Sequence, residues 1–255
     1  MKKLILREED VHTGSLILVN ANHGIQGELQ DFLLPAFDRQ PEVLLQRSAA
    51  TLLNCLMQKI RGWQSIVPVS GFRSHQEQQA IWDDSLRENG RVFTETYVAL
   101  PGHSEHQTGL AIDLGLRQDE IDFIRPDFLD TGVCHAFRQN AASYGFILRY
   151  PAGKSHVTGI GHEPWHFRYV GTPHAQIMEE QELTLEEYVD FLRQFSYEDH
   201  PYTLRQDGQG LRISFLPAAS AVGLPDSRFA FDLPDDHPYT VSGNNVDGFI
   251  LTEWK

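Results

Sequence analysis

The spacing of apolar residues over the first 196 positions predicts a mixture of strands and helices. Short apolar runs predict strands at 16–19, 66–69, 110–114, 146–150 and 165–170. Apolar residues at helical spacing predict helices over 43–60, 133–144 and 179–195. Because the strands and helices do not alternate as a regular βαβ repeat, we assign the chain to the α+β class.

One further helix has clear signals at both ends. Ser74 and Glu77 fit the S-x-x-E capping box at a helix start, and Gly90 after Asn89 fits a helix end. Arg73 therefore lies at the junction between the strand 66–69 and this helix. A side chain at such a junction projects over the edge of a sheet.

The pattern changes after Ser196. Residues 211–216 alternate between apolar and polar, and the stretches 239–242 and 246–251 read as a hairpin around an Asn-rich turn. We therefore predict two parts, a larger domain over 1–196 and a small β-rich appendage over 197–255.

Charge and the N-terminal residues narrow the class of protein. The formal net charge is −14, which argues against nucleic acid or an anionic membrane as a partner. The basic start Lys2-Lys3 is followed by three apolar residues and then by Arg7, too short an apolar run for a secretory signal. We therefore expect a cytoplasmic protein. The only cysteines are Cys55 and Cys134, so a disulfide scaffold is not expected.

Two clusters carry residues suited to metal chemistry. In the first, His106 and Asp113 stand seven residues apart with Gly109 between them, and both types are normal zinc ligands. The second runs from Gly161 to Gly171, includes His162 and His166, and supplies another imidazole and a carboxylate, Glu163.

The second cluster formally matches H-E-x-x-H, in which two histidines one helical turn apart bind zinc. Pro164 argues against a helix, because it restricts Glu163 to extended geometry. The following residues alternate like a strand, with His166 and Arg168 on one face. We therefore expect only His166 of the two histidines to be a ligand.

Taken together, these motifs resemble a known family. The pattern S-x-H-x-x-G-x-A-x-D over 104–113, followed by E-P-W-H over 163–166, is similar to the LAS-type zinc peptidases, and most similar to VanY and VanXY D,D-carboxypeptidases. Further similar segments are 18–20, 70–74, 145–151 and 168–171, so the resemblance extends over residues 15–190. It implies a small central antiparallel sheet flanked by helices, within a zinc D,D-peptidase catalytic domain over 1–196.

The resemblance also implies roles for individual residues. His106, Asp113 and His166 match the ligands of one zinc ion per chain. Glu163 matches the catalytic base and Arg73 the arginine that steadies the oxyanion. In addition, Ser104 matches a serine that contacts the terminal carboxylate of the substrate. The position of His162 is often aromatic in relatives, which alters the surroundings of the site but no ligand.

General chemistry agrees with these roles. Three protein ligands leave a fourth position on zinc for water, whose pKa the metal lowers toward about 7. A nearby carboxylate could take a proton from that water and deliver it to the leaving amine.

The expected reaction is hydrolysis at D-Ala-D-Ala ends. In the cytoplasm the available substrates are the free dipeptide D-Ala-D-Ala and UDP-MurNAc-pentapeptide, so the resemblance implies a combined D,D-dipeptidase and D,D-carboxypeptidase of glycopeptide (vancomycin) resistance. Two alternatives stay open: an L,D-carboxypeptidase or endopeptidase of the same type acting on peptidoglycan, and a non-catalytic zinc-binding recognition domain. The sequence leaves undetermined the balance of the two activities, the tolerance of D-Ala-D-Ser or D-Ala-D-lactate, the oligomeric state and the role of the appendage.

Overall fold

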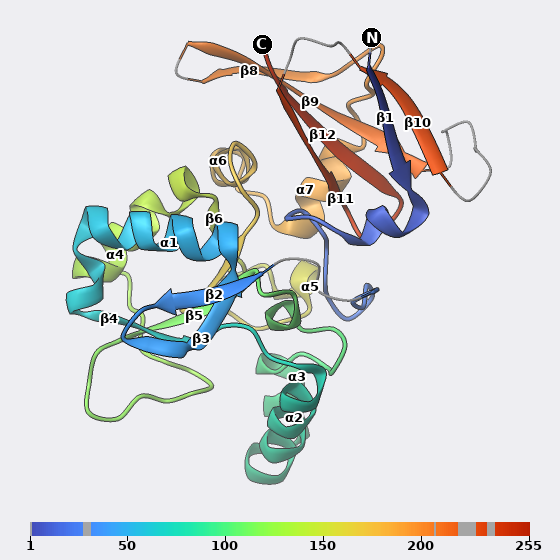
Figure 1. The fold of residues 1–255 in the computed structure, drawn as a ribbon. Helices are drawn as coiled ribbons and strands as arrows, with labels where there is room; N and C mark the ends of the chain where they lie inside the picture. The colour runs from blue at the N-terminus through green and yellow to red at the C-terminus, as the bar shows by residue number, and fades with distance from the viewer. Residues whose placement is uncertain (1, 28–31, 207, 219–227, 234–237) are drawn as a thin grey trace. The chain divides into compact units, whose positions relative to one another are not determined.

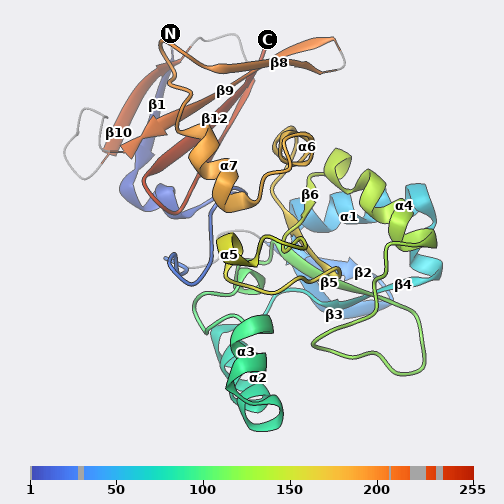
Figure 2. The same ribbon diagram turned by 180° about the vertical axis from the view of Figure 1, so that it is seen from behind.

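The protein is described by a computed structural model that covers residues 2–27, 32–206, 208–218, 228–233 and 238–255 (Figures 1 and 2). The chain divides into two compact units. The larger unit is Val19–Thr184, and the smaller combines Met1–Leu18 with Leu185–Lys255.

The larger unit contains the segments that carry the predicted chemistry. Its helices are α1 (Arg47–Ile60), η2 (Gly62–Gln64), α2 (His75–Asn89), α3 (Arg91–Tyr97), η3 (Glu105–Thr108), α4 (Gly132–Ala141), η4 (Ala142–Tyr144), α5 (Ser155–Thr158) and α6 (His174–Glu180). Its strands are β2 (Leu33–Phe37), β3 (Gln40–Gln46), β4 (Ile66–Ser70), β5 (Ala111–Leu116), β6 (Phe146–Leu148) and β7 (His166–Tyr169).

A four-stranded antiparallel sheet in the order β4-β5-β7-β6 forms the centre of this unit, beside the hairpin β2-β3. Helices α1 and α4 contact each other and pack over the central sheet (Figure 1). Their apolar residues form one buried core with the inward-facing residues of the strands. The members with no measurable exposure include Leu53, Leu56, Phe137, Ile112, Leu114 and Phe167.

The alternation of side chains along β5 and β7 separates this core from the site. Ile112 and Leu114 of β5, with Phe167 of β7, belong to the core under the helices. Asp113 lies between Ile112 and Leu114 in sequence and His166 directly precedes Phe167, so both point to the opposite face of the sheet. This confirms the α+β class, with a small antiparallel sheet flanked by helices.

The predicted capping box at the start of α2 is present. Ser74 Oγ accepts a hydrogen bond from the backbone N–H of Glu77 at 3.2 Å, and the Glu77 carboxylate accepts one from the Ser74 N–H at 2.7 Å. The helix ends at Asn89 before Gly90, as the sequence predicts. This fixed helix start places Arg73 immediately before the N-cap Ser74, three residues after Ser70, the last residue of β4.

The smaller unit is mainly β-structure. Strand β1 (Lys2–Arg7) pairs with β10 (Arg228–Leu233), and a second sheet has the order β11-β12-β9-β8. Its members are β8 (Tyr202–Gln206), β9 (Gln209–Pro217), β11 (Tyr239–Gly243) and β12 (Gly248–Trp254), and the remaining helices are η1 (Glu8–His12) and α7 (Leu185–Leu192). The predicted hairpin of 239–251 is present as β11 and β12.

The predicted division into 1–196 and 197–255 stays a prediction. In the contact pattern, the smaller unit includes the β-rich segment together with α7 and the first 18 residues. Residue Leu18 shows this directly, because its N–H donates to the carbonyl of Asn244 at 3.0 Å.

Three predicted elements were wrong in type or extent. Residues 16–19 are buried but form no strand, since the backbone of Leu18 bonds to a loop instead of a neighbouring strand. The predicted helix 43–60 begins only at Arg47, because residues up to Gln46 pair with β2. The predicted helix 179–195 is interrupted, since α6 ends at Glu180 and α7 begins at Leu185.

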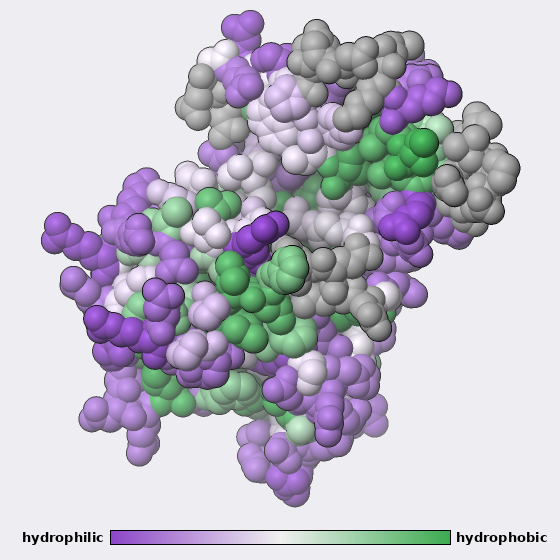
Figure 3. Space-filling view, in the orientation of Figure 1, coloured by the Kyte–Doolittle hydropathy of each residue, from purple (hydrophilic) through white to green (hydrophobic). Residues whose placement is uncertain are grey.

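The surface in Figure 3 is predominantly hydrophilic, with smaller apolar areas. The large apolar side chains that are exposed include Val92, Leu129, Phe123 and Leu100. Among the described residues, no helix combines the length and the apolar character needed to cross a membrane.

Candidate active site

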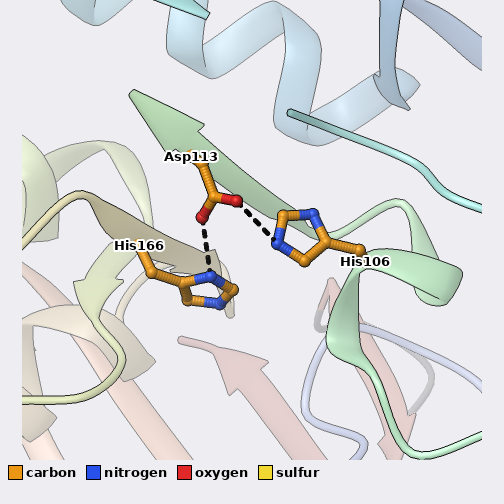
Figure 4. Close-up of side chains that lie close together, drawn as sticks. All are labelled: His106, Asp113 and His166. Atoms are coloured by element: carbon orange, nitrogen blue, oxygen red, sulfur yellow. Dashed lines mark hydrogen bonds and ion pairs between the residues drawn. The ribbon is translucent and has the colours of Figure 1, made fainter. Parts of the chain in front are cut away.

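The structure brings His106, Asp113 and His166 together (Figure 4). Asp113 and His166 are direct register partners on the paired strands β5 and β7, while His106 comes from η3. Each residue offers a ligand atom, and these atoms lie within 4.8 Å of one another. All three residues are buried, with 4% of each exposed.

Asp113 lies between the two imidazole rings. Its Oδ2 is 3.1 Å from His106 Nε2, and its Oδ1 is 2.9 Å from His166 Nδ1. Burial raises the pKa of Asp113, but the charges and hydrogen bonds of the two histidines outweigh this effect and hold the pKa well below its usual range. The carboxylate is therefore in the form that binds metal.

The turn before β5 depends on Gly109, whose φ is 68°. A Cβ at this position would lie 2.9 Å from Leu33 Cδ2 and 3.3 Å from the backbone nitrogen of Gln46. A glycine is therefore required both by the left-handed backbone and by the close approach of β2 and β3. This turn allows His106 and Asp113 to point toward one place.

The donor set fits zinc. Two imidazoles and one carboxylate are the ligands of open catalytic zinc sites, and their convergence in a buried position needs a counter-charge for the carboxylate. His106 is also held in the correct tautomer, since its Nδ1 donates to the carbonyl of Gly71 at 2.7 Å and leaves Nε2 free to bind a metal. The three residues therefore form a metal-binding triad.

Glu163 lies beside this triad, as the sequence predicts. Its Oε2 is 3.7 Å from His166 Nδ1, and only 5% of the residue is exposed. Burial raises the pKa of Glu163 to about 8, and the charge of His166 opposes that increase. A carboxylate in this environment holds a proton near neutral pH more readily than a surface glutamate does.

Arg73 also reaches the triad. Its Nη2 donates to Asp113 Oδ2 at 3.0 Å, its Nε to Ser70 Oγ at 2.8 Å, and its Nη1 to Gln78 Oε1 at 3.2 Å. These three bonds fix the guanidinium plane, and Phe123 lies against it with a centroid distance of 5.5 Å. Burial lowers the pKa of Arg73, while Asp113 and Glu163 oppose the shift.

A small cavity of about 40 Å³ joins the predicted residues. Its wall includes all six of them: Arg73, Ser104, His106, Asp113, Glu163 and His166. Ser104 is only 2% exposed and comes directly before η3. The remaining wall is largely apolar or aromatic and includes Tyr97, Val98, Phe123, Ile124, Tyr150 and Trp165.

Comparison with known proteins agrees with this arrangement. Residues 42–172 match VanY, the family of D-alanyl-D-alanine carboxypeptidases. The chain belongs to the VanY family. It is 45% identical over 184 residues to the bifunctional D-Ala-D-Ala dipeptidase and carboxypeptidase VanXYC of Enterococcus gallinarum. The aligned residues cover 71% of this chain and 96% of the relative.

Two solved structures are also similar to this chain. The D,D-dipeptidase VanXYg, in complex with a D-Ala-D-Ala phosphinate analogue, has a TM-score of 0.94 and 46% identity over 100% of this chain and 99% of the other. The second is a mutant of the D,D-pentapeptidase VanY from a VanB-type resistance cassette, in complex with Zn(II). It has a TM-score of 0.56 and 31% identity, and the match covers 69% of this chain and 98% of the other. These similarities confirm the LAS-type fold that the sequence resemblance implies.

The H-E-x-x-H match is not a helix in this VanY-family chain. Residues 161–163 have no regular structure, 164–165 form a turn, and His166 begins β7. His162 lies outside the triad, and its Nδ1 is 2.9 Å from the carbonyl oxygen of Tyr150. The expectation that only His166 of this motif joins the metal ligands agrees with the geometry.

Sequence reasoning missed a buried ionic cluster beside the triad residue His166. Glu105, Arg149 and Arg168 are at most 2% exposed, and both arginines donate to the same oxygen, Glu105 Oε1, at 2.8 Å. The available signal was Arg168, which the strand alternation places on the same face as His166.

Proposed function

We propose that this chain is a zinc-dependent D,D-carboxypeptidase and D,D-dipeptidase that removes the terminal D-alanine from D-Ala-D-Ala ends. The observation that carries the proposal is the convergence of the triad His106, Asp113 and His166 with Glu163 on one cavity. Similarity to the bifunctional VanXYC over 96% of that protein supports both activities.

Zinc, when bound by the triad, supplies a Lewis acid that polarises the substrate carbonyl and makes water a better nucleophile near neutral pH. Glu163 Oε2 lies beside the triad and accepts a proton from the attacking water. The same oxygen then delivers that proton to the nitrogen of the departing D-alanine. With zinc bound in the triad, the positive charge beside Glu163 would favour its carboxylate form, which the first step needs.

Arg73 and Ser104 bind the two negatively charged groups of the reacting substrate, the developing oxyanion and the terminal carboxylate. The guanidinium of Arg73, held by three hydrogen bonds at the cavity wall, stabilises negative charge that develops on the carbonyl oxygen. Ser104, in the same wall, donates a hydrogen bond from its hydroxyl to the terminal carboxylate of the substrate. In a chain of net charge −14, such local donors are what an anionic peptide end requires.

The proposed substrates are the free dipeptide D-Ala-D-Ala and the cytoplasmic precursor UDP-MurNAc-pentapeptide. Solved relatives bind D-Ala-D-Ala and its phosphinate analogue, which supports the choice of the scissile bond. Cytoplasmic location is part of this proposal, and so is a role in glycopeptide resistance. Removal of D-Ala-D-Ala ends would remove the site on the precursor that vancomycin binds.

A substrate panel tests the proposal. Zinc-loaded protein is assayed for D-alanine release from D-Ala-D-Ala, from UDP-MurNAc-pentapeptide and from the tetrapeptide precursor that ends in a single D-alanine. We expect release from the first two and none from the third. Release from the tetrapeptide alone would instead identify an L,D-carboxypeptidase, and zinc binding without release from any substrate or from peptidoglycan would identify a recognition domain.

A further inference from the structure

The buried cluster of Glu105, Arg149 and Arg168 lies directly against a metal ligand. All its charged groups belong to the larger unit, and the side chains of the three residues have no measurable exposure. Burying one carboxylate and two guanidinium groups is costly unless they are paired. A cluster of this kind next to the triad therefore calls for a role beyond packing.

The two oxygens of Glu105 have different surroundings. Oε1 accepts from Arg149 Nε and from Arg168 Nη1, each at 2.8 Å, so its acceptor capacity is used by the arginines. Oε2 makes no hydrogen bond in the described part of the structure. It lies 3.5 Å from His166 Nε2, a buried ring nitrogen that also makes no hydrogen bond there.

The two nitrogens of His166 face opposite partners. Nδ1 points to the triad centre, 2.9 Å from Asp113 Oδ1, with Glu163 Oε2 at 3.7 Å. Nε2 points away from that centre, to Glu105. His106 has the reverse arrangement, since its Nε2 faces Asp113 and its Nδ1 is bonded to the carbonyl of Gly71.

We propose that Glu105 is a positioning residue that accepts a hydrogen bond from His166 Nε2–H and so fixes His166 as an Nδ1 ligand, with Arg149 and Arg168 holding the carboxylate in place. This inference rests on the proposed zinc site. The two histidines then bind one metal through different ring nitrogens. Each is fixed by a different acceptor, a backbone carbonyl for His106 and a clamped carboxylate for His166.

The arginines explain why a carboxylate is needed at position 105. Both require an acceptor at Oε1, and His166 requires a second acceptor at Oε2. A glutamine would satisfy the arginines with its carbonyl oxygen and would then turn its NH2 group toward His166 Nε2. Two donors would face each other, which disfavours the tautomer that binds metal through Nδ1.

The ring nitrogens of the wild-type protein test this directly. In protein with ¹⁵N-labelled histidine and one bound zinc, long-range ¹H–¹⁵N spectra report which nitrogen of each ligand carries the proton. We expect one ligand histidine with zinc on Nε2 and the other with zinc on Nδ1 and a proton on Nε2. Two ligands bound through Nε2 would overturn the proposal. The result does not depend on peptide hydrolysis, so it is distinct from a failure of the proposed function.

Variants give the second test. We expect Glu105→Gln and Glu105→Ala to weaken zinc affinity about 10- to 100-fold, measured by competition with a chromophoric chelator. Glu253→Gln is the matched control, because Glu253 is equally buried at 2% exposure but belongs to the smaller unit. Folded Glu105→Gln protein with the zinc affinity of the control would contradict the proposal.

Discussion

Asp113 is the residue that links the two histidines of the metal site. Its Oδ2 faces His106 Nε2 and also contacts Arg73, and its Oδ1 faces His166 Nδ1. Its negative charge offsets part of the cost of gathering a dication and a guanidinium in a buried place. The site therefore depends on the charge of this residue as well as on its shape.

An Asp113→Asn substitution keeps the shape of the side chain and removes its charge. We expect zinc affinity to fall by more than the 10- to 100-fold that loss of an outer contact costs, because a direct ligand is weakened. Competition with a chromophoric chelator measures the change, and Asp83→Asn on an exposed position of α2 is the control. Unchanged affinity in Asp113→Asn would remove this residue from the ligand set.

His174 gives a prediction for stability against pH. It is 5% exposed, and burial lowers its pKa to about 3 from an ordinary value near 6.5. Below pH 6.5 the unfolded chain binds a proton at this position and the folded chain does not, so the free energy of unfolding decreases as pH falls. Between pH 6 and pH 4, the free energy of unfolding of the wild type should decrease by up to about 1.4 kcal/mol more per pH unit than that of His174→Gln. Parallel denaturant titrations at several pH values check this, and identical slopes for the two proteins would contradict it.

For single residues of the site, the sequence predicted those that belong to motifs and missed those that do not. The ligand triad, Glu163, Arg73 and Ser104 stand in recognisable patterns, and the structure gathers them on one cavity. Glu105 and Arg149 carry no such pattern, and charged side chains are usually exposed. Their burial depends on a pairing between residues 44 positions apart, which the sequence does not display.

Among the elements, the pairing of β5 with β7 and the turn before β5 decide the geometry of the site. The register places Asp113 opposite His166, and the left-handed Gly109 allows η3 to return His106 to the same place. The neighbouring contacts of Gly109 come from Leu33 and Gln46, at the ends of β2 and β3. The hairpin thus supports the turn that carries a ligand.

Gly109→Ala should disturb this turn. The left-handed backbone costs about 1 kcal/mol for alanine, and the 2.9 Å contact with Leu33 adds to that cost. Gly153→Ala is the matched control, because Gly153 has a φ of 81° and nothing within 4 Å of an added Cβ. Denaturant unfolding should show a larger loss of stability for Gly109→Ala, accompanied by weaker zinc binding. Equal effects of the two substitutions on both quantities would show that the contact is unimportant.

The elements with local signals were predicted well. The helix with a capping box and a terminal glycine has the predicted limits, and so does the hairpin of 239–251 in outline. The errors at 43–60 and 179–195 arose where apolar spacing fits more than one structure. Residues 43–46 are compatible with a helix alone, but pairing with β2 makes them a strand, and only tertiary contacts decide between the two.

For the whole molecule, the site lies within one compact unit. All residues of the triad, its neighbours and the buried ionic cluster fall within Val19–Thr184. The family match at 42–172 lies inside the same range, whereas VanXYg is similar over the whole chain. The sequence resemblance was confined to residues 15–190, so the pairing of β1 with β10 across more than 200 residues could not be predicted from it.

The most direct test of the account compares D-alanine release from D-Ala-D-Ala by wild type and Glu163→Gln, each loaded with one zinc ion per chain. The substitution removes the proton acceptor beside the triad and leaves all three ligands in place. We predict release by wild type and a decrease of about 100- to 10,000-fold in the variant, with zinc content unchanged. Release by Glu163→Gln at the wild-type rate, or no release by either zinc-loaded protein, would contradict the assignment of this chain as a zinc D,D-peptidase that uses Glu163 as its base.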